Sequence, residues 1–194
     1  AWINDRNFEK SEWDLVHSKH NEWIIYGYYK FLKTNANSNS ILVLSEYGKD
    51  VKDTKELIKQ LKISKNVIWI PKLKRKEIME IISICDVGIG EFFQTSKTLW
   101  GGCGLEIIAC GIPLIHSFKF LNNEFEKIFE FPPPPLCAAN SVDEIYEWMQ
   151  KLYNSEILRK KISKKTSTWF DKYNGLGLAK KILNFSVDKN YMKN

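Results

Sequence analysis

The chain has 194 residues, and 44% of them are hydrophobic, which is enough apolar material for the core of one domain of ordinary size. Its 29 basic and 23 acidic residues leave a net charge of +6, but the basic residues are scattered among acids along predicted helices. This composition excludes a disordered chain, and no apolar run approaches the roughly 18 residues of a membrane span.

The cysteines indicate the redox environment of the protein, and the first residues indicate whether the chain is part of a longer one. No two of the four cysteines form a C-x-x-C pair, so we expect reduced thiols and a cytoplasmic protein. The chain begins at Ala1 and has no basic-then-apolar leader pattern, so we expect it to be cut from a longer protein.

Short apolar strands alternate with amphipathic helices from residue 13 onward. Trp13–Ser18 is strand-like, and hydrophobic residues then recur at helical spacing from Trp23 to Leu32. Asp53 is the predicted N-cap of the next helix. The later strands are predicted at 41–44, 67–70, 86–90, 114–118 and 136–138. The helices between them are predicted at 54–61, 77–84, 105–110 and 123–129.

The last part of the chain is predicted to be helical. Ser141 and Glu144 have capping-box spacing, and the apolar stripe that follows predicts a helix through Leu152. Two more helices are predicted at 155–173 and 178–183, separated by glycines, and the polar end of the chain is predicted to fray.

This alternation predicts an α/β fold: a Rossmann-like three-layer domain in which helices cover both faces of a parallel sheet. Ligands bind such folds beyond the carboxyl ends of the strands. Three predicted loops lie there, at 18–20, 45–48 and 92–104.

The segment Thr98–Ile115 carries the main candidate site. It has three glycines, Gly101, Gly102 and Gly104, followed by one carboxylate, Glu106. Glycines let a backbone approach a ligand closely, and a helix that begins beside them directs unpaired N–H groups at an anion. The spacing matches neither the dinucleotide fingerprint nor the P-loop. Glu106 is either a ligand of vicinal ribose hydroxyls or a helix N-terminal charge.

Other polar residues give weaker indications. Lys19 is placed to supply positive charge to a diphosphate, but it is also an ordinary surface residue, and the same holds more strongly for His17 and His20. His116 is predicted to lie in the core or at a sheet edge. The basic run Lys72–Lys76 is interpreted as solvated loop charge, so no nucleic-acid partner is expected.

No group of residues predicts a metal or a cofactor. Histidines, cysteines and carboxylates do not occur at metal-ligand spacing, and there is no Asp-x-Asp motif. A metal-dependent transferase is therefore disfavoured, and no nucleophile–base set has a recognisable signature.

Three successive pieces of the sequence, Asn66–Pro71, Ile84–Gly88 and Gly104–Ile115, resemble a known family. They are similar to the C-terminal, donor-binding domain of retaining glycosyltransferases of family 4, the glycosyl transferases group 1. The resemblance extends over about residues 13–185 and is strongest over Leu105–Pro113. It implies one half of a GT-B fold and a nucleoside-diphosphate sugar, such as a UDP- or GDP-sugar, as the substrate.

The resemblance assigns roles within the glycine segment. The family has two glutamates separated by seven residues, and Glu106 matches the second, which binds the ribose hydroxyls. The first, which contacts the transferred sugar, falls on Thr98, and this is a departure from the family pattern. Trp100 and Gly101 match the aromatic–glycine pair that follows. Gly101 and Gly102 match the loop whose amides face the diphosphate or the sugar.

The resemblance also assigns catalytic roles to Lys19 and Glu106. Lys19–Glu22 resembles the family's Lys-Gly-Asn-Asp segment, which makes Lys19 the diphosphate lysine. The partner arginine of that lysine has no match, and Lys10 and Arg6 are the nearest basic residues. Base and sugar selection are expected to depend on the loops near Pro71 and Glu91.

Further expectations concern the whole protein. We expect residues 1–20 to be a lead-in from a missing N-terminal acceptor domain, 21–185 the sugar-nucleotide domain, and 186–194 a frayed tail. The implied reaction is metal-independent transfer with retention to a glycan, lipid or polysaccharide acceptor, and the acceptor implies peripheral association with the inner face of the membrane. The alternative is a degenerate, non-catalytic interaction domain.

Overall fold

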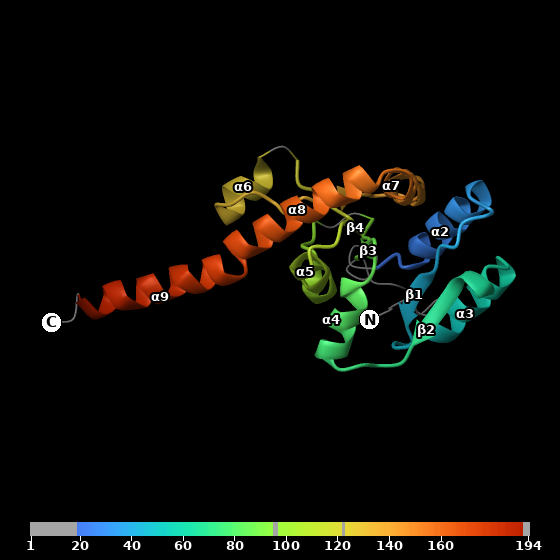
Figure 1. The fold of residues 1–194 in the computed structure, drawn as a ribbon, viewed down its shortest axis with the longest axis horizontal. Coiled ribbons are helices and arrows are strands. Elements are labelled where there is room, and N and C mark those ends of the chain that lie inside the picture. Colours follow the sequence, from blue (N-terminus) through green and yellow to red (C-terminus); the bar gives the residue numbers. More distant parts are fainter. Residues whose placement is uncertain (1–18, 95–96, 122, 192–194) are drawn as a thin grey trace, which may run out of the picture.

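The computed structural model of the chain describes residues 19–94, 97–121 and 123–191, and for 187–191 it describes only the backbone. Helices surround two groups of short strands, and the last helix extends away from the other elements towards the C-terminal end (Figure 1). Among the described residues, none of the helices combines the length and the apolar character needed to cross a bilayer.

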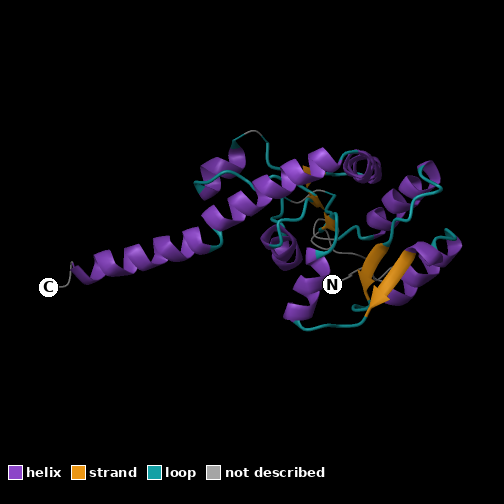
Figure 2. Ribbon diagram, in the orientation of Figure 1, coloured by secondary structure: helices purple, strands orange, loops and turns teal. Residues whose placement is uncertain are grey.

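The first group of elements contains two parallel strands. Leu42 pairs with Val67 and Ser45 pairs with Ile70, so the strands are in register along their whole length. Figure 2 shows this strand pair beside helix α3. The elements are α2 (Glu22–Thr34), β1 (Leu42–Ser45), α3 (Val51–Gln60), the 3-10 turn η1 (Ser64–Asn66) and β2 (Val67–Ile70).

The second group contains three parallel strands in the order β3-β4-β5. Its elements are α4 (Arg75–Ser83), β3 (Gly88–Ile89), α5 (Gly101–Ala109), β4 (Leu114–His116), α6 (Glu124–Phe129) and β5 (Cys137–Ala138). The chain ends in α7 (Val142–Asn154), α8 (Glu156–Tyr173) and α9 (Leu176–Tyr191).

The predicted α/β class with parallel strands is confirmed. The described strands form two sheets, whereas one sheet was predicted. The predicted strand Trp13–Ser18 lies outside the described residues.

Several predicted helix boundaries were wrong. Helix α3 begins at Val51, so Asp53 lies in its first turn and is not its N-cap. Helix α5 begins at Gly101, four residues before the predicted start at Leu105. A Cβ atom at Gly104 would lie 2.7 Å from Cβ of Trp100, so glycine permits the close packing of this first turn. Packing therefore overrides the low helix propensity of glycine.

Helices α7 and α8 begin at side-chain caps, of which the one at Ser141 was predicted. The Ser141 hydroxyl accepts a hydrogen bond from the Glu144 N–H at 3.2 Å, and the Ser155 hydroxyl accepts one from the Leu158 N–H at 3.1 Å. Helix α9 is longer than the predicted 178–183 and runs to Tyr191.

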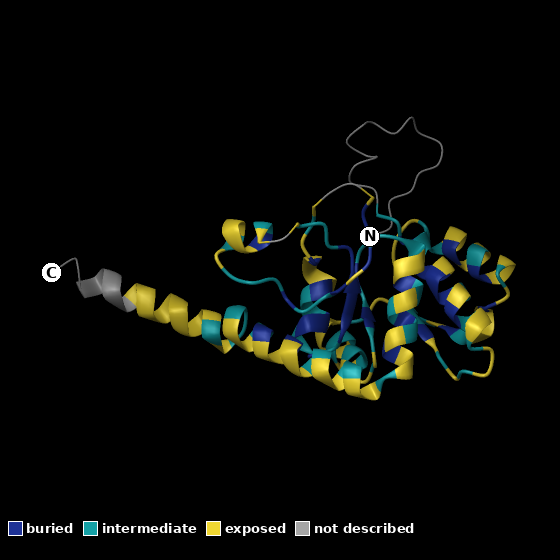
Figure 3. Ribbon diagram, turned by 90° about the horizontal axis from the view of Figure 1, so that it is seen from above, coloured by how far each residue is buried: buried dark blue, intermediate teal, exposed yellow. Residues whose placement is uncertain are grey.

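Two hydrophobic clusters form the core. The first joins α2 to α7, where a Cβ atom at Gly27 would lie 2.8 Å from Cγ2 of Ile145. The second is rich in aromatic side chains and joins the start of α5 to α6 and α8 through Trp100, Phe125 and Trp169. Figure 3 shows the buried residues gathered on the strands and inner helix faces, while the described surface of α9 is almost entirely exposed.

Candidate active site

Lys19 lies just before α2 and next to the segment that follows β3. It pairs with Phe93 through an antiparallel bridge, and the N–H of the next residue, His20, donates to the Phe92 carbonyl at 2.9 Å. The Lys19 ammonium forms an ion pair with the carboxylate of Glu91, and their side chains are 24% and 25% exposed. The structure thus brings the predicted diphosphate lysine to the carboxyl end of β3.

The Glu91 carboxylate also lies against the first residue of α5. A Cβ atom at Gly101 would lie 3.5 Å from Oε2 of Glu91. Gly101 has a φ of +59°, a conformation that glycine adopts without a steric penalty. The N-cap residue Trp100 makes no side-chain cap hydrogen bond. A negative group at this end of a helix is favoured by the helix dipole and by the unpaired amides of the first turn.

A buried histidine fixes the backbone of Glu91. The Glu91 N–H donates to Nδ1 of His116 at 2.9 Å, and the Ser117 N–H donates to the Glu91 carbonyl at 3.1 Å. His116 is fully buried, as predicted for a core residue. Burial lowers the pKa of His116 from 6.5 to about 4, and the nearby negative charge of Glu91 opposes this shift without cancelling it. At neutral pH the ring is therefore uncharged, with its proton on Nε2.

Glu106 lies in the second turn of α5 and has an ionic partner. Its Oε1 is 3.1 Å from Nε of Arg75, the first residue of α4. The Glu106 side chain is 18% exposed and that of Arg75 is 77% exposed. The carboxylate is held by a cation that solvent reaches easily.

The remaining positions of the glycine segment differ in character. The Thr98 hydroxyl is buried and has no hydrogen-bond partner among the described residues. Trp100 is buried and packs edge-on against Trp169, with ring centroids 5.4 Å apart. No atom lies within 4 Å of the position that a Cβ atom would take at Gly102. Trp100 therefore packs in the core, whereas Gly102 borders open space.

The other basic candidates do not join this cluster. The His20 ring stacks on Trp23 with centroids 4.7 Å apart, and its Nδ1 lies 2.9 Å from Oε1 of Glu22. These contacts tie His20 to the start of α2. Arg6, Lys10 and His17 lie outside the described residues.

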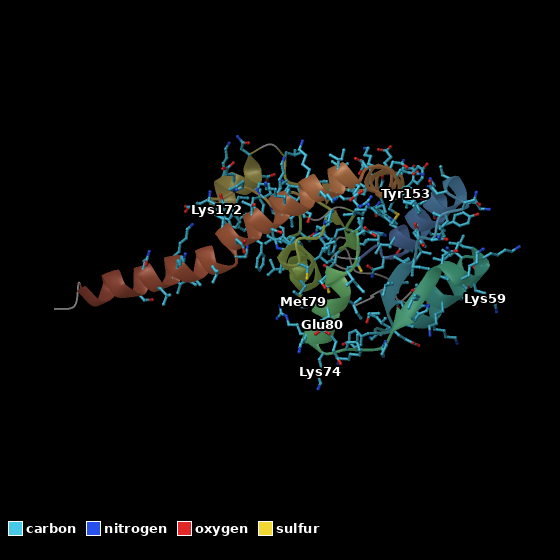
Figure 4. All side chains as sticks on the ribbon, in the orientation of Figure 1. Lys59, Lys74, Met79, Glu80, Tyr153 and Lys172 are labelled. Atoms are coloured by element: carbon cyan, nitrogen blue, oxygen red, sulfur yellow. The ribbon has the colours of Figure 1, made fainter. Side chains whose placement is uncertain are left out.

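Apart from Arg75, the basic run at the start of α4 makes contacts away from this cluster. Lys72 lies over the ring of Tyr47 at 5.0 Å, and Lys76 lies 3.9 Å from Glu80. Lys74 and Glu80 both extend from the exposed surface here (Figure 4). The charges are solvated and partly paired, as predicted for loop charge.

A groove of about 380 Å³ opens on the α2–α3 side of Lys19. Besides Lys19, four acidic side chains line it: Glu22, Asp50, Asp53 and Glu56. Neither Glu106 nor any residue of 98–102 contributes to its walls. Because four carboxylates would repel a diphosphate, this groove is poorly suited to bind one.

Sequence reasoning proposed Lys19, Glu106 and the glycines as candidates, but it missed the side chains of Glu91 and Arg75 as their ionic partners. A signal existed for Arg75, because it belongs to the basic run Lys72–Lys76 that precedes a predicted helix. For Glu91 the only signal was its place at the end of a predicted strand.

Comparison with solved structures gives similar folds at low sequence identity. The chain is similar to WaaG, a glycosyltransferase of lipopolysaccharide biosynthesis, with a TM-score of 0.58 and 15% identity over 90% of this chain and 44% of that chain. It is similar to the C-terminal domain of the group 1 glycosyltransferase LpcC from Francisella tularensis, with a TM-score of 0.58 and 19% identity over 78% and 77% of the two chains.

A third similar structure is S. aureus TarM in complex with UDP, with a TM-score of 0.63 and 13% identity over 88% of this chain and 33% of that chain. The chain thus spans less than half the length of WaaG and of TarM. A comparison with curated proteins gives no match. The family model described as glycosyl transferases group 1 matches residues 25–169, which is most of the chain. The protein therefore belongs to the glycosyl transferases group 1 family, with the fold of one half of a GT-B glycosyltransferase.

Proposed function

We propose that this chain binds the nucleoside-diphosphate sugar donor of a retaining, metal-independent glycosyltransferase. The observation that carries the proposal is the meeting of the Lys19 ammonium and the N-terminal end of α5 at one carboxylate, that of Glu91. An ammonium group and the first amides of a helix both bind anions. Membership of the family and the UDP in the TarM structure support a nucleoside diphosphate as that anion.

The proposed roles follow from the chemistry of each group. Lys19 and the amides at Gly101 and Gly102 would stabilise the negative charge that develops on the departing nucleoside diphosphate. Glu106 would accept hydrogen bonds from the ribose hydroxyls after Arg75 has moved away. The buried Thr98 hydroxyl would contact the transferred sugar, where the family resemblance places a glutamate. Catalysis would be positional and electrostatic.

A second domain would complete the enzyme. The chain spans 44% of WaaG and 33% of TarM, so acceptor binding belongs to another part of the protein in this proposal. Residues 21–185 would form the donor domain, and the acceptor would be a glycan, a lipid or a polysaccharide at the inner face of the membrane. The isolated chain should bind a nucleoside diphosphate weakly and transfer little sugar.

Calorimetry with UDP and GDP tests the ribose role. We expect Glu106→Ala to weaken binding of the preferred nucleotide about tenfold to a hundredfold, because a hydrogen bond to a charged group contributes about 1.5–3 kcal/mol. Glu147→Ala is the matched control, since Glu147 is an exposed carboxylate on α7 that pairs with Lys151. Equal binding by the original protein and Glu106→Ala would rule out the ribose role.

The second candidate function is a non-catalytic interaction domain. Two observations favour it: threonine at position 98, and the existing ion pair of Lys19 with Glu91. A domain that is well folded by circular dichroism but has no nucleotide affinity at millimolar concentration would favour this alternative.

A further inference from the structure

We propose that Glu91 is an internal anion of the donor site, whose carboxylate occupies the position of the donor diphosphate and is exchanged for it on binding. Glu91 would then set the affinity for the donor. This inference rests on the proposed function, because it concerns the same Lys19 and the same helix end. No part of the sequence pattern assigns a role to this carboxylate.

The charge geometry carries the first step. The Glu91 carboxylate contacts the Lys19 ammonium through Oε1. Its Oε2 lies 3.5 Å from the point where a Cβ atom would be if Gly101 had a side chain. It thus contacts the ammonium group and lies beside the first residue of α5, the two features that attract an anion. Since an arriving phosphate needs the same two groups, the carboxylate and the phosphate compete for one position.

The backbone around Glu91 limits how the exchange can occur. On either side of Glu91, the Gly90 N–H donates to the Ile115 carbonyl at 2.9 Å and the Phe92 carbonyl accepts from the His20 N–H at 2.9 Å. Glu91 itself is held through both its N–H and its carbonyl. The carboxylate can therefore leave only by rotation of its side chain, and its 25% exposure gives it a path to solvent.

A different role for Glu91 predicts a different result. If its carboxylate replaced the family glutamate that is missing at Thr98, it would contact the hydroxyls of the transferred sugar. Removing it would then weaken the binding of a nucleotide sugar and leave the free nucleotide unaffected. If it is the internal anion, removing its charge strengthens the binding of both.

Calorimetry at low ionic strength with UDP, UDP-glucose and inorganic pyrophosphate separates these roles. We expect Glu91→Gln to bind UDP and pyrophosphate about tenfold more tightly than the original protein, which corresponds to about 1.4 kcal/mol. Glu91→Ala should strengthen binding in the same direction. Glu147→Gln, which removes an equal charge from the exposed surface of α7, should change affinity by less than about twofold.

A double-mutant cycle with Lys19→Met tests the exchange itself. In the Lys19→Met background the gain from Glu91→Gln should shrink, because the carboxylate then has no ammonium to occupy. Circular dichroism and denaturant unfolding confirm that each variant is folded.

The outcomes separate this proposal from the proposed function. UDP binding that is the same in the original protein, Glu91→Gln and Glu91→Ala overturns the internal anion and leaves donor binding intact. Weaker UDP-glucose binding with unchanged UDP binding also overturns it, in favour of a sugar contact. If neither UDP nor pyrophosphate binds to any of these proteins, both proposals are wrong.

Discussion

Two ion pairs flank helix α5, and they differ in how tightly the protein holds them. At the N-terminal end, Lys19 and Glu91 are about equally exposed, and the backbone of Glu91 is fixed by hydrogen bonds to His116 and Ser117. Along the helix, Glu106 is mostly buried, but its partner Arg75 is 77% exposed. The first pair is built into the end of a strand, whereas the second depends on a cation that solvent surrounds.

This difference suggests how each pair responds to a ligand. An exposed arginine contributes little to the stability of its ion pair and leaves at little cost. A lysine held beside an anchored carboxylate is released only when another anion takes that place. A nucleotide that contacts both pairs would therefore displace Arg75 easily and compete mainly with Glu91.

The largest expected effect is on the free energy of unfolding, and it comes from His116, whose ring accepts the hydrogen bond from the Glu91 N–H. The pKa of His116 is lowered to about 4 in the folded protein, so below pH 6.5 the unfolded chain binds a proton that the folded chain does not. The free energy of unfolding should therefore fall as the pH is lowered from 6.5 to 4, by up to about 3 kcal/mol. Above pH 6.5 this contribution is absent. Denaturant unfolding at several pH values measures it.

His116→Asn isolates that contribution, because the asparagine oxygen can still accept the Glu91 N–H but does not titrate. The pKa values of Glu124 and Glu156 are lowered by Lys97 and Lys160, so their protonation at low pH also destabilises the folded protein. This loss is the same in the original protein and in His116→Asn. The same pH dependence in the variant as in the original protein would show that His116 is not the titrating group.

The comparison of the two pairs also shows which features of the site could be predicted from the sequence. Local spacing and the family resemblance gave Lys19, Glu106 and the glycines as candidates, and the alternation of strands and helices predicted the α/β class. Each ion pair, however, joins residues that are distant in the chain, 72 positions apart for Lys19 and Glu91. The antiparallel bridge between Lys19 and Phe93 forms the first pair, and the packing of α4 beside α5 forms the second. Both are tertiary contacts, so a sequence without structure could not pair these residues.

The start of α5 was missed for a related reason. Three glycines before an apolar run resemble a loop, because glycine has a low helix propensity. In the structure Gly104 lets the first turn pack against Trp100, and this contact with the aromatic cluster stabilises a turn that propensity alone would not. The predicted loop amides are thus helix N-terminal amides, which suits an anion better.

Gly102 tests whether a ligand uses the N-terminal end of α5, beside the first pair. A Cβ atom here would meet no protein atom within 4 Å, so Gly102→Ala should fold normally and gain up to about 1 kcal/mol of helix stability. If a diphosphate approaches this amide closely, the added methyl group should weaken UDP binding about tenfold, or about 1.4 kcal/mol. Calorimetry and thermal unfolding measure the two effects. Unchanged UDP affinity would mean that the ligand does not approach Gly102.

The smallest expected effect, on both UDP affinity and stability, comes from the pair of Arg75 and Glu106. Arg75→Gln removes the cation from Glu106 while the carboxylate stays in place. Because Arg75 is 77% exposed, we expect UDP affinity and the free energy of unfolding to change little, with less than about a threefold change in affinity. Lys76→Gln, which removes a neighbouring charge from α4 that is also well exposed, is the matched control. A tenfold or greater loss of affinity in Arg75→Gln alone would show that Arg75 itself binds the donor. The second pair would then be part of the diphosphate site, and the contrast with Lys19 and Glu91 would no longer hold.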